Sequence, residues 1–145
     1  MPKHAEKKPL PYTPEQMFDL VADVGRYPEF LPWCRGARVR RREGDLIVAD
    51  LVIGFKGVTE RFTSRVTTDR AHMIIDVAYE EGPFKYLENH WEFIEAQGGC
   101  VVDFYVDFEF RSRFLQGLIG AVFTEAVRRM VNAFEQRAGV LYAKS

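Results

Sequence analysis

The 145-residue chain lacks the short motifs by which most enzymes are recognised. It contains no glycine-rich phosphate loop, no GxSxG sequence and no HExxH sequence, and Ser64 and Ser112 have no neighbouring base to activate them. Its two cysteines, Cys34 and Cys100, form no CxxC pair and have no histidine pair at zinc-ligand spacing beside them. We therefore expect two reduced thiols, no metal site and no required cofactor, and no motif supports a catalytic residue.

Net charge and long apolar runs are also missing. The formal net charge is -1 at pH 7, so no global positive field would recruit DNA, RNA or anionic lipid. The longest apolar run, residues 117–123, is far shorter than the ~20 residues of a membrane span. The basic N-terminus has no apolar stretch behind it to form a secretory signal. We expect a cytoplasmic protein without a DNA partner, whose contact with the inner membrane is peripheral and transient.

Aromatic residues, in contrast, are abundant. They make up 14% of the chain and include 12 Phe, enough for a large core or a hydrophobic pocket. Residues 102–110 alternate almost perfectly between apolar and polar, which predicts a strand. The segment after it carries apolar residues over roughly half of a helix circumference, whereas packing on one sheet needs about 100°. Either a strongly curved sheet wraps around this helix, or sheet and helix enclose an apolar cavity that a ligand fills.

The periodicity of the whole chain predicts a single α+β domain over residues 1–145. Thr13, Pro14 and Gln16 form a capping box with proline at the first helical position, so a helix should run to about Val24. Strands are then expected at residues 39–42, 46–55, 58–68, 73–79, 87–93 and 102–110. Their short turns favour an antiparallel meander of about six strands, followed by one helix of about 28 residues. Residues 3–10 could add an edge strand, although lysines and prolines leave them little alternation.

Two polar residues are expected on the apolar face of the sheet. Strand parity turns Glu60 and Asn89 inward, where a polar group is costly unless it is paired or hydrated. They either anchor the head group of a ligand or lie at a strand end that water reaches, or a bulge reverses the parity of the strand. His90, with Glu88 and Glu92, lies on the opposite face, as a general base or metal site or, more simply, as part of a solvated surface.

One basic cluster stands out, formed by Arg35, Arg38, Arg40, Arg41 and Arg42. Such a cluster could contact RNA or anionic lipid heads. Alternation along a strand divides it between two faces, however, and the interleaved aromatic residues of a single-strand binder are absent. A solvated sheet edge is the simpler interpretation.

Four strings of the sequence carry a resemblance to a known family. They are PYTPEQMFDLVADVGRYPEFLPWC, DLVIGFKGVTERFTSRV, GPFKYLENHWEF and FEFRSRFLQGLIGAVF. Through them the chain resembles the coenzyme Q-binding START-domain family, part of the START/Bet v-like group that includes polyketide cyclase/dehydrase-like and lipid-transfer domains.

The resemblance implies a helix-grip fold, in which a curved antiparallel sheet wraps around a long C-terminal helix, with short helices near the N-terminus, and encloses a hydrophobic tunnel. It also implies non-catalytic binding of ubiquinone or a similar isoprenoid lipid in support of respiratory electron transport. Some bacterial members are named ribosome-association toxins, so ribosome contact is the second hypothesis. A cyclase- or dehydrase-like enzyme is the third, and it would require an inward acid or base.

The resemblance and the periodicity together predict the wall of the tunnel. Residues in the matching strings that would line or cap it are Phe55, Phe62, Phe84, Leu87 and Trp91. An aromatic corner, formed by Tyr27, Phe30 and Trp33, follows the first helix. The remaining predicted ligand-binding residues come from this corner, the last strand and the C-terminal helix: Trp33, Phe104, Val106, Phe108, Leu115, Leu118, Ile119, Val122, Phe123 and Ala126.

Overall fold

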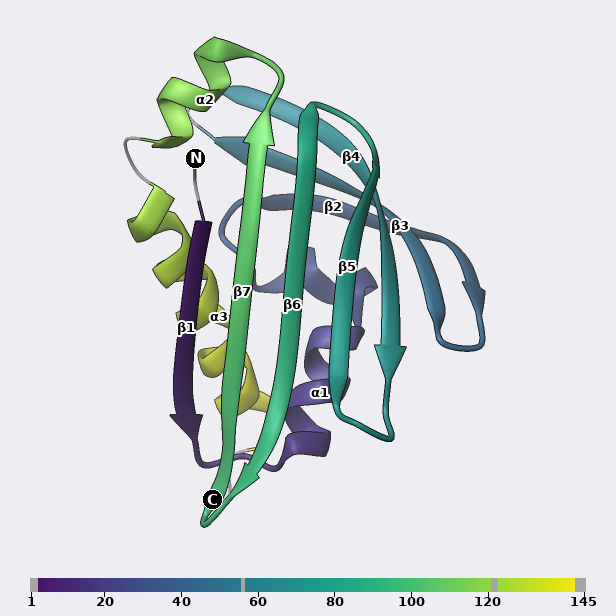
Figure 1. The fold of residues 1–145 in the computed structure, drawn as a ribbon, viewed down its shortest axis with the longest axis vertical. Helices are drawn as coiled ribbons and strands as arrows, with labels where there is room; N and C mark the ends of the chain where they lie inside the picture. The colour runs from purple at the N-terminus through teal and green to yellow at the C-terminus, as the bar shows by residue number, and fades with distance from the viewer. Residues whose placement is uncertain (1–2, 56, 121–122, 143–145) are drawn as a thin grey trace.

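The computed structural model describes residues 3–55, 57–120 and 123–142. A seven-stranded antiparallel sheet curves over helices that lie behind it in Figure 1. The elements in chain order are β1 (Lys3–Leu10), α1 (Pro14–Ala22), the 3-10 helix η1 (Val24–Glu29), β2 (Cys34–Glu43), β3 (Leu46–Phe55), β4 (Val58–Asp69), β5 (Ile74–Glu81), β6 (Phe84–Ala96), β7 (Gly99–Phe110), α2 (Arg113–Gly120) and α3 (Phe123–Tyr142).

The strand order is β1-β7-β6-β5-β4-β3-β2, so every strand from β2 to β7 pairs with its neighbour in sequence. This is the predicted meander, and its inward faces are the predicted ones. In β4, for example, Phe62, Ser64 and Val66 are buried while Arg61 and Arg65 are exposed. A period of two needs no distant partner to set which residues share a face, and this is why parity was readable in the sequence.

The uncertain first strand forms and pairs along its whole length with β7, from Lys3 opposite Asp107 to Leu10 opposite Cys100. Lys8 adds a tertiary tie, because its ammonium lies 2.6 Å from a carboxylate oxygen of Glu135 on α3. Proline is tolerated here because β1 is an edge strand, where a missing N–H need not break a ladder. One edge of the sheet is therefore closed by a strand whose own pattern hardly predicts it.

Helix α1 begins as predicted. The Thr13 hydroxyl accepts a hydrogen bond from the Gln16 amide at 3.0 Å, and the Gln16 side chain accepts one from the Thr13 amide at 3.0 Å. The helix buries Met17 and Phe18 against the sheet and ends at Ala22, slightly before the expected Val24, because the chain continues as the 3-10 helix η1.

The C-terminal region departs from the expectation of one continuous helix of about 28 residues. The structure describes two helices, α2 across the upper end of the sheet and α3 running down behind it (Figure 1). Gly117 and Gly120 both lie in α2, and glycine is a poor helix former. The two helices cover different parts of the core. Of the helices in the described ranges, none combines the length and the apolar character needed to span a membrane.

The core has two clusters of buried side chains. The larger one centres on Phe18, Trp91, Phe104 and Phe134, between the sheet, α1 and α3. The smaller one lies under α2 and consists of the buried residues Phe62, Phe84 and Phe110, with Leu115 and Ile119 packed against them. A curved antiparallel sheet that holds a C-terminal helix is the predicted helix-grip α+β fold, and the prediction is confirmed.

Candidate ligand-binding cavities

Between the sheet and the C-terminal helices the two clusters leave room for two cavities. The first, which we call the α2 cavity, has a volume of about 240 Å³ and lies under α2. Strand ends of β3, β4, β6 and β7 form its floor, and α2 with the start of α3 forms its roof. Its lining residues are Trp33, Ile53, Gly54, Val58, Glu60, Phe62, Phe84, Leu87, Val106, Phe108, Phe110, Leu115, Leu118, Ile119, Phe123, Ala126, Val127 and Met130.

The second, the central cavity, has a volume of about 210 Å³ and lies between the middle of the sheet, η1 and the middle of α3. Its lining residues are Val24, Tyr27, Leu31, Trp33, Cys34, Leu51, Ile53, Phe62, Ser64, Val66, Val77, Leu87, Asn89, Trp91, Phe104, Val106, Met130 and Phe134.

The two cavities share part of their walls, namely Trp33, Ile53, Phe62, Leu87, Val106 and Met130. Each alone is smaller than the about 300–1,000 Å³ of a usual small-molecule site. A ligand of ordinary size would therefore extend from one cavity into the other.

Polar groups on these walls are few. Glu60 is half-buried in the wall of the α2 cavity, and Asn89 lies in the wall of the central cavity, so both residues face inward as predicted. The Asn89 amide donates to the Tyr105 carbonyl oxygen at 2.8 Å and accepts from the Trp91 indole N–H at 2.8 Å. Asn89 thus mainly orients Trp91 in the wall.

Three further polar groups line the central cavity. The Tyr27 hydroxyl donates to the Val21 carbonyl oxygen, and burial raises the pKa of Tyr27 far above its usual value. Burial also raises the pKa of the Cys34 thiol, so both groups are uncharged at neutral pH. The Ser64 hydroxyl is buried and has no hydrogen-bond partner among the described residues.

The segment that supplies Trp33 is held in place by aromatic packing. Tyr27 and Phe30 both meet the ring of Phe134 on α3 edge to face, with centroid distances of 5.4 Å and 5.2 Å. Such pairs add about 0.5–1.5 kcal/mol beyond their buried area. In the aromatic corner predicted from the sequence, Tyr27 and Phe30 pack against the α3 core, Tyr27 also lines the central cavity, and Trp33 lines both cavities.

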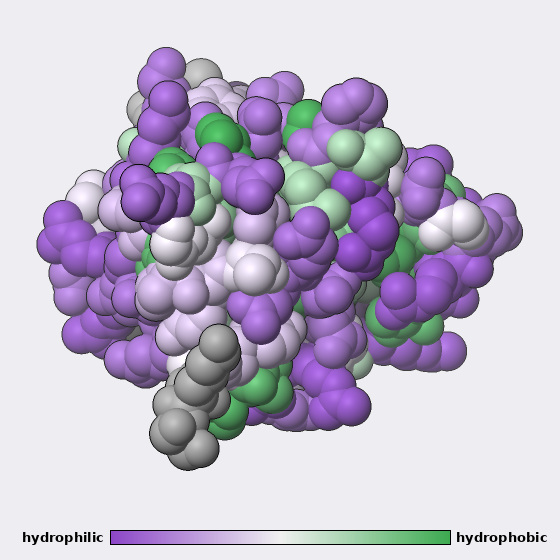
Figure 2. All heavy atoms as spheres, turned by 90° about the horizontal axis from the view of Figure 1, so that it is seen from below, coloured by the Kyte–Doolittle hydropathy of each residue, from purple (hydrophilic) through white to green (hydrophobic). Residues whose placement is uncertain are grey.

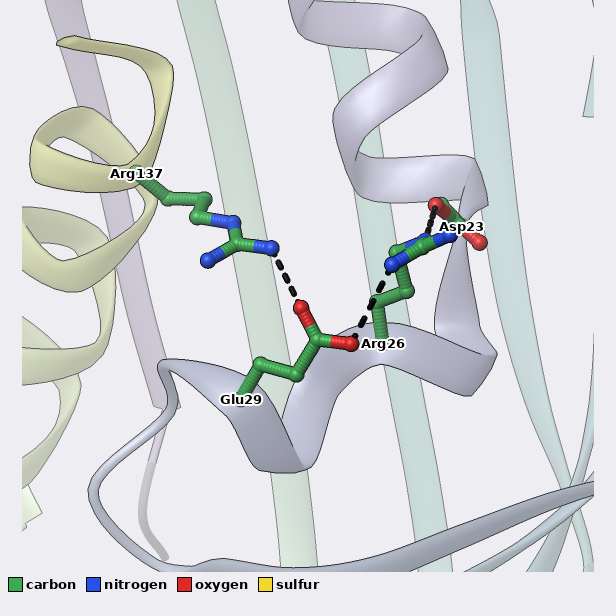
Figure 3. A network of polar contacts seen from close by, with 4 residues as sticks. All are labelled: Asp23, Arg26, Glu29 and Arg137. Atoms are coloured by element: carbon green, nitrogen blue, oxygen red, sulfur yellow. Dashed lines mark hydrogen bonds and ion pairs between the residues drawn. The ribbon is translucent and has the colours of Figure 1, made fainter. Parts of the chain in front are cut away.

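A charged network reinforces the same segment (Figure 3). Arg137 on α3 lies 2.5 Å from a carboxylate oxygen of Glu29 on η1, and Arg26 bridges Glu29 and Asp23 at 3.2 Å each. Arg137 also lies over the Phe30 ring, 5.3 Å from its centroid. The contacts of Arg137 therefore tie η1 and Phe30 to α3.

Comparison with known proteins identifies the family. Residues 10–135 match the family model described as polyketide cyclase/dehydrase and lipid transport. The chain belongs to this family. It is 42% identical over 134 residues to a protein named ribosome association toxin RatA from Rickettsia prowazekii, covering 90% of this chain and 92% of the relative.

Two further similarities agree with this family. The chain is 36% identical over 146 residues to coenzyme Q-binding protein COQ10 homolog B, mitochondrial, from Xenopus laevis, covering 98% of this chain and 60% of the relative. A START superfamily protein from Mycobacterium smegmatis has the same fold, with a TM-score of 0.82 at 17% identity over 96% of this chain and 98% of the other. The predicted START-like membership is confirmed.

In this member of the polyketide cyclase/dehydrase and lipid transport family, the predicted tunnel residues gather around the two cavities. Those that line the α2 cavity, the central cavity or both are Trp33, Phe62, Phe84, Leu87, Trp91, Phe104, Val106, Phe108, Leu115, Leu118, Ile119, Phe123 and Ala126. Of the other two, Phe55 has its backbone in β3 but its side chain lies outside the described part of the chain, and Val122 lies outside the described residues. That these residues bind a ligand stays a prediction.

The sequence reasoning missed several wall residues that the same signals indicate. Ile53 shares strand parity with Leu51, and Phe110 shares it with Phe108. Val127 and Met130 follow Phe123 at helical spacing. Each lines a cavity, and each could have been found by extending the inward face to the ends of its element.

The other candidate sites lie outside the cavities. His90 lies 2.5 Å from a carboxylate oxygen of Asp76 on the neighbouring strand β5, on the outer face. Within residues 3–55, 57–120 and 123–142, no three His, Cys, Asp or Glu side chains cluster in a way that could hold a metal ion. The position of His90 beside Asp76 fits the hypothesis of a solvated outer face better than the hypothesis of a metal site.

The arginine cluster occupies β2, the second edge of the sheet, and its faces differ from the expectation. A bulge interrupts the register between Val39 and Arg41, so that Arg38 pairs with Asp50 and Arg41 pairs with Val48. Paired residues share a face of the sheet, and Asp50 and Val48 alternate with the inward Ala49. Arg38 and Arg41 therefore both lie on the outer face, where Arg40 also contacts Asp50 at 3.6 Å.

Proposed function

We propose that the protein binds ubiquinone or a related isoprenoid lipid in the two cavities and performs no chemistry on it. The observation that carries the proposal is the wall: two cavities that share side chains and are lined almost entirely by aliphatic and aromatic groups. The coenzyme Q-binding name of one relative supports the choice of a quinone.

Simple energetics make an apolar wall sufficient. Each buried methylene contributes about 0.8 kcal/mol, so ten buried carbons of an isoprenoid tail would contribute about 8 kcal/mol. Before the costs of association, that amount corresponds to a micromolar Kd. Recognition of the head group then adds selectivity to an affinity that the tail already supplies.

The experiment is recovery of the ligand from the purified protein. We expect organic solvent extraction to release a quinone, and native mass spectrometry to show the protein with one quinone bound. Ligand-free protein incubated with ubiquinone should regain the same complex, and the recovered quinone should be chemically unchanged. A folded protein that carries no quinone and does not take one up would refute the proposal, and a modified quinone would favour the enzyme hypothesis instead.

A second candidate function, contact with the ribosome, is supported by three arginines of β2. Arg38, Arg40 and Arg41 lie on one outer face of an edge strand, all of them exposed. Clustered arginines on one face can contact several backbone phosphates of RNA, and a relative of this chain is named a ribosome association toxin. The bulge exchanges Arg42 for Arg41 on this face, and Arg42, opposite the inward Ile47, lies on the other face.

Co-sedimentation with ribosomal subunits tests this candidate. Replacing Arg38, Arg40 and Arg41 together by Glu should abolish co-sedimentation, and so should raising the salt concentration, because phosphate contacts weaken steeply with salt. The control matched in charge replaces three exposed helix arginines by Glu: Arg113 on α2, and Arg128 and Arg129 on α3, which are ion-paired to Glu125. If both variants lose binding equally, the effect is one of net charge and not of the β2 face.

A further inference from the structure

The Ser64 hydroxyl is the polar group of the cavities that the fold leaves unsatisfied. Ser64 is 1% exposed, and its oxygen has no hydrogen-bond partner among the described residues. It lies on the inward face of β4, between Ala49 on β3 and Tyr79 on β5, and its side chain lines the central cavity. A buried hydroxyl without a partner destabilises the folded protein, so a ligand group that accepts a hydrogen bond from it would be stabilised there.

The surroundings of Ser64 restrict the chemistry of that group. No Asp, Glu, Lys or Arg is found among the described residues that line the central cavity. A carboxylate or phosphate placed there would lose its hydration without gaining a cation, which is strongly unfavourable. An uncharged partner is therefore favoured, and a carbonyl or ether oxygen, which can only accept, would take the hydrogen bond that the hydroxyl can donate.

The α2 cavity differs at this point. Its charged wall residue is Glu60, and an ionised carboxylate accepts hydrogen bonds but donates none. A carbonyl oxygen placed beside Glu60 would meet another acceptor, whereas beside Ser64 it would meet a donor. The apolar walls of the α2 cavity suit a hydrocarbon tail.

We propose that the ligand binds with its uncharged, oxygen-bearing end in the central cavity, where the Ser64 hydroxyl donates a hydrogen bond to a carbonyl oxygen, and with its hydrocarbon tail in the α2 cavity. This rests on the proposed function, and it adds a direction and a ligand class: neutral lipids with a carbonyl oxygen at one end, in preference to fatty acids. Ser64 is then a specificity-determining residue.

The test compares two probes that differ in their oxygens, 2-decyl-1,4-benzoquinone and decylbenzene, by isothermal titration calorimetry. Ser64→Ala should weaken binding of the quinone about three- to tenfold, the usual effect of one hydrogen bond, and leave decylbenzene unchanged. The matched control is Thr63→Val, because Thr63 lies on the same strand but donates its hydroxyl to Asp50 on the outer face, at 2.6 Å. This control should alter neither probe.

A second measurement uses charge. Methyl decanoate should bind at least about tenfold more tightly than decanoate at pH 8, since only the anion must be desolvated without a counter-charge. Ser64→Ala should also keep or raise the Tm of the ligand-free protein, because it removes an unsatisfied buried hydroxyl. This readout excludes misfolding as the cause of weaker binding.

The outcomes separate the two proposals. Suppose that the wild-type protein binds the quinone, and that Ser64→Ala either binds it equally well or loses affinity for both probes to the same extent. The inward position of the head group is then refuted, whereas lipid binding stands. Equal affinity for decanoate and its ester would refute the preference for neutral ligands. If the wild-type protein binds neither the quinone nor decylbenzene, both the proposed function and this inference are wrong.

Discussion

Replacing Leu118 by Lys separates ligand binding from folding. Leu118 lies on α2 and is half-buried, with its side chain in the wall of the α2 cavity. In the ligand-free protein a lysine there can extend its ammonium group to solvent, so we expect the free energy of unfolding to change by no more than about 1 kcal/mol. With a ligand bound, the ammonium group would either face the hydrocarbon tail or displace it.

Desolvation sets the size of the effect. Removing an ammonium group from water without a counter-charge costs several kcal/mol in real proteins, and a loss of about 3 kcal/mol in binding corresponds to roughly 150-fold in Kd. We therefore expect Leu118→Lys to weaken binding of a decylated quinone by at least about 100-fold while it stays folded.

The chain contains its own probe for this titration. Its two tryptophans, Trp33 and Trp91, both line the cavities, and a quinone bound beside them should quench their fluorescence. The control is Phe114→Lys on the same helix, since Phe114 is 69% exposed and is absent from both described cavity walls. Wild-type affinity in folded Leu118→Lys would show that the ligand does not lie under α2.

Three further predictions concern stability. Phe104→Ala should cost about 3–5 kcal/mol in chemical denaturation, since Phe104 is 1% exposed and packs 4.6 Å from the Trp91 ring. Gly99→Ala should cost about 1–3 kcal/mol, because its Cβ would lie 2.0 Å from the Leu10 carbonyl oxygen, and an unchanged Tm would contradict this. Burial raises the pKa of Tyr27, so above about pH 10 the folded state keeps a proton that the unfolded state loses, and the free energy of unfolding should fall. In alkaline denaturation, Tyr27→Phe should make that fall shallower.

Few apolar side chains are exposed at the end of the molecule that lies opposite α2. Hydrophilic side chains predominate in this view, and apolar ones occur in small groups (Figure 2). Within the described residues, the large apolar side chains that stay exposed are Ile94, Phe114, Val140 and Leu141. Most of the wide apolar face of the C-terminal segment is therefore used inside, in the core and in the walls of the two cavities.

Two local features were not predictable from the pattern of the chain. The bulge in β2 adds a residue that shifts the phase of the arginines, and strict alternation cannot show where such an insertion falls. Where one helix was expected, the structure describes two, α2 and α3. The apolar spacing of residues 115–141 does not distinguish one long helix from two shorter ones. In both places the outcome depends on contacts with neighbouring elements.

The sequence by itself determined which residues face inward, where α1 begins and which segments form the meander, because a period of two, a helical period and a capping box are all set by residues close together in the chain. Tertiary structure decided whether residues 3–10 pair with β7, and whether the apolar surfaces of the sheet and the C-terminal helices meet or leave a gap. It also decided that the Ser64 hydroxyl has no hydrogen-bond partner among the described residues. These are long-range outcomes of how distant surfaces pack together, and no local pattern encodes them.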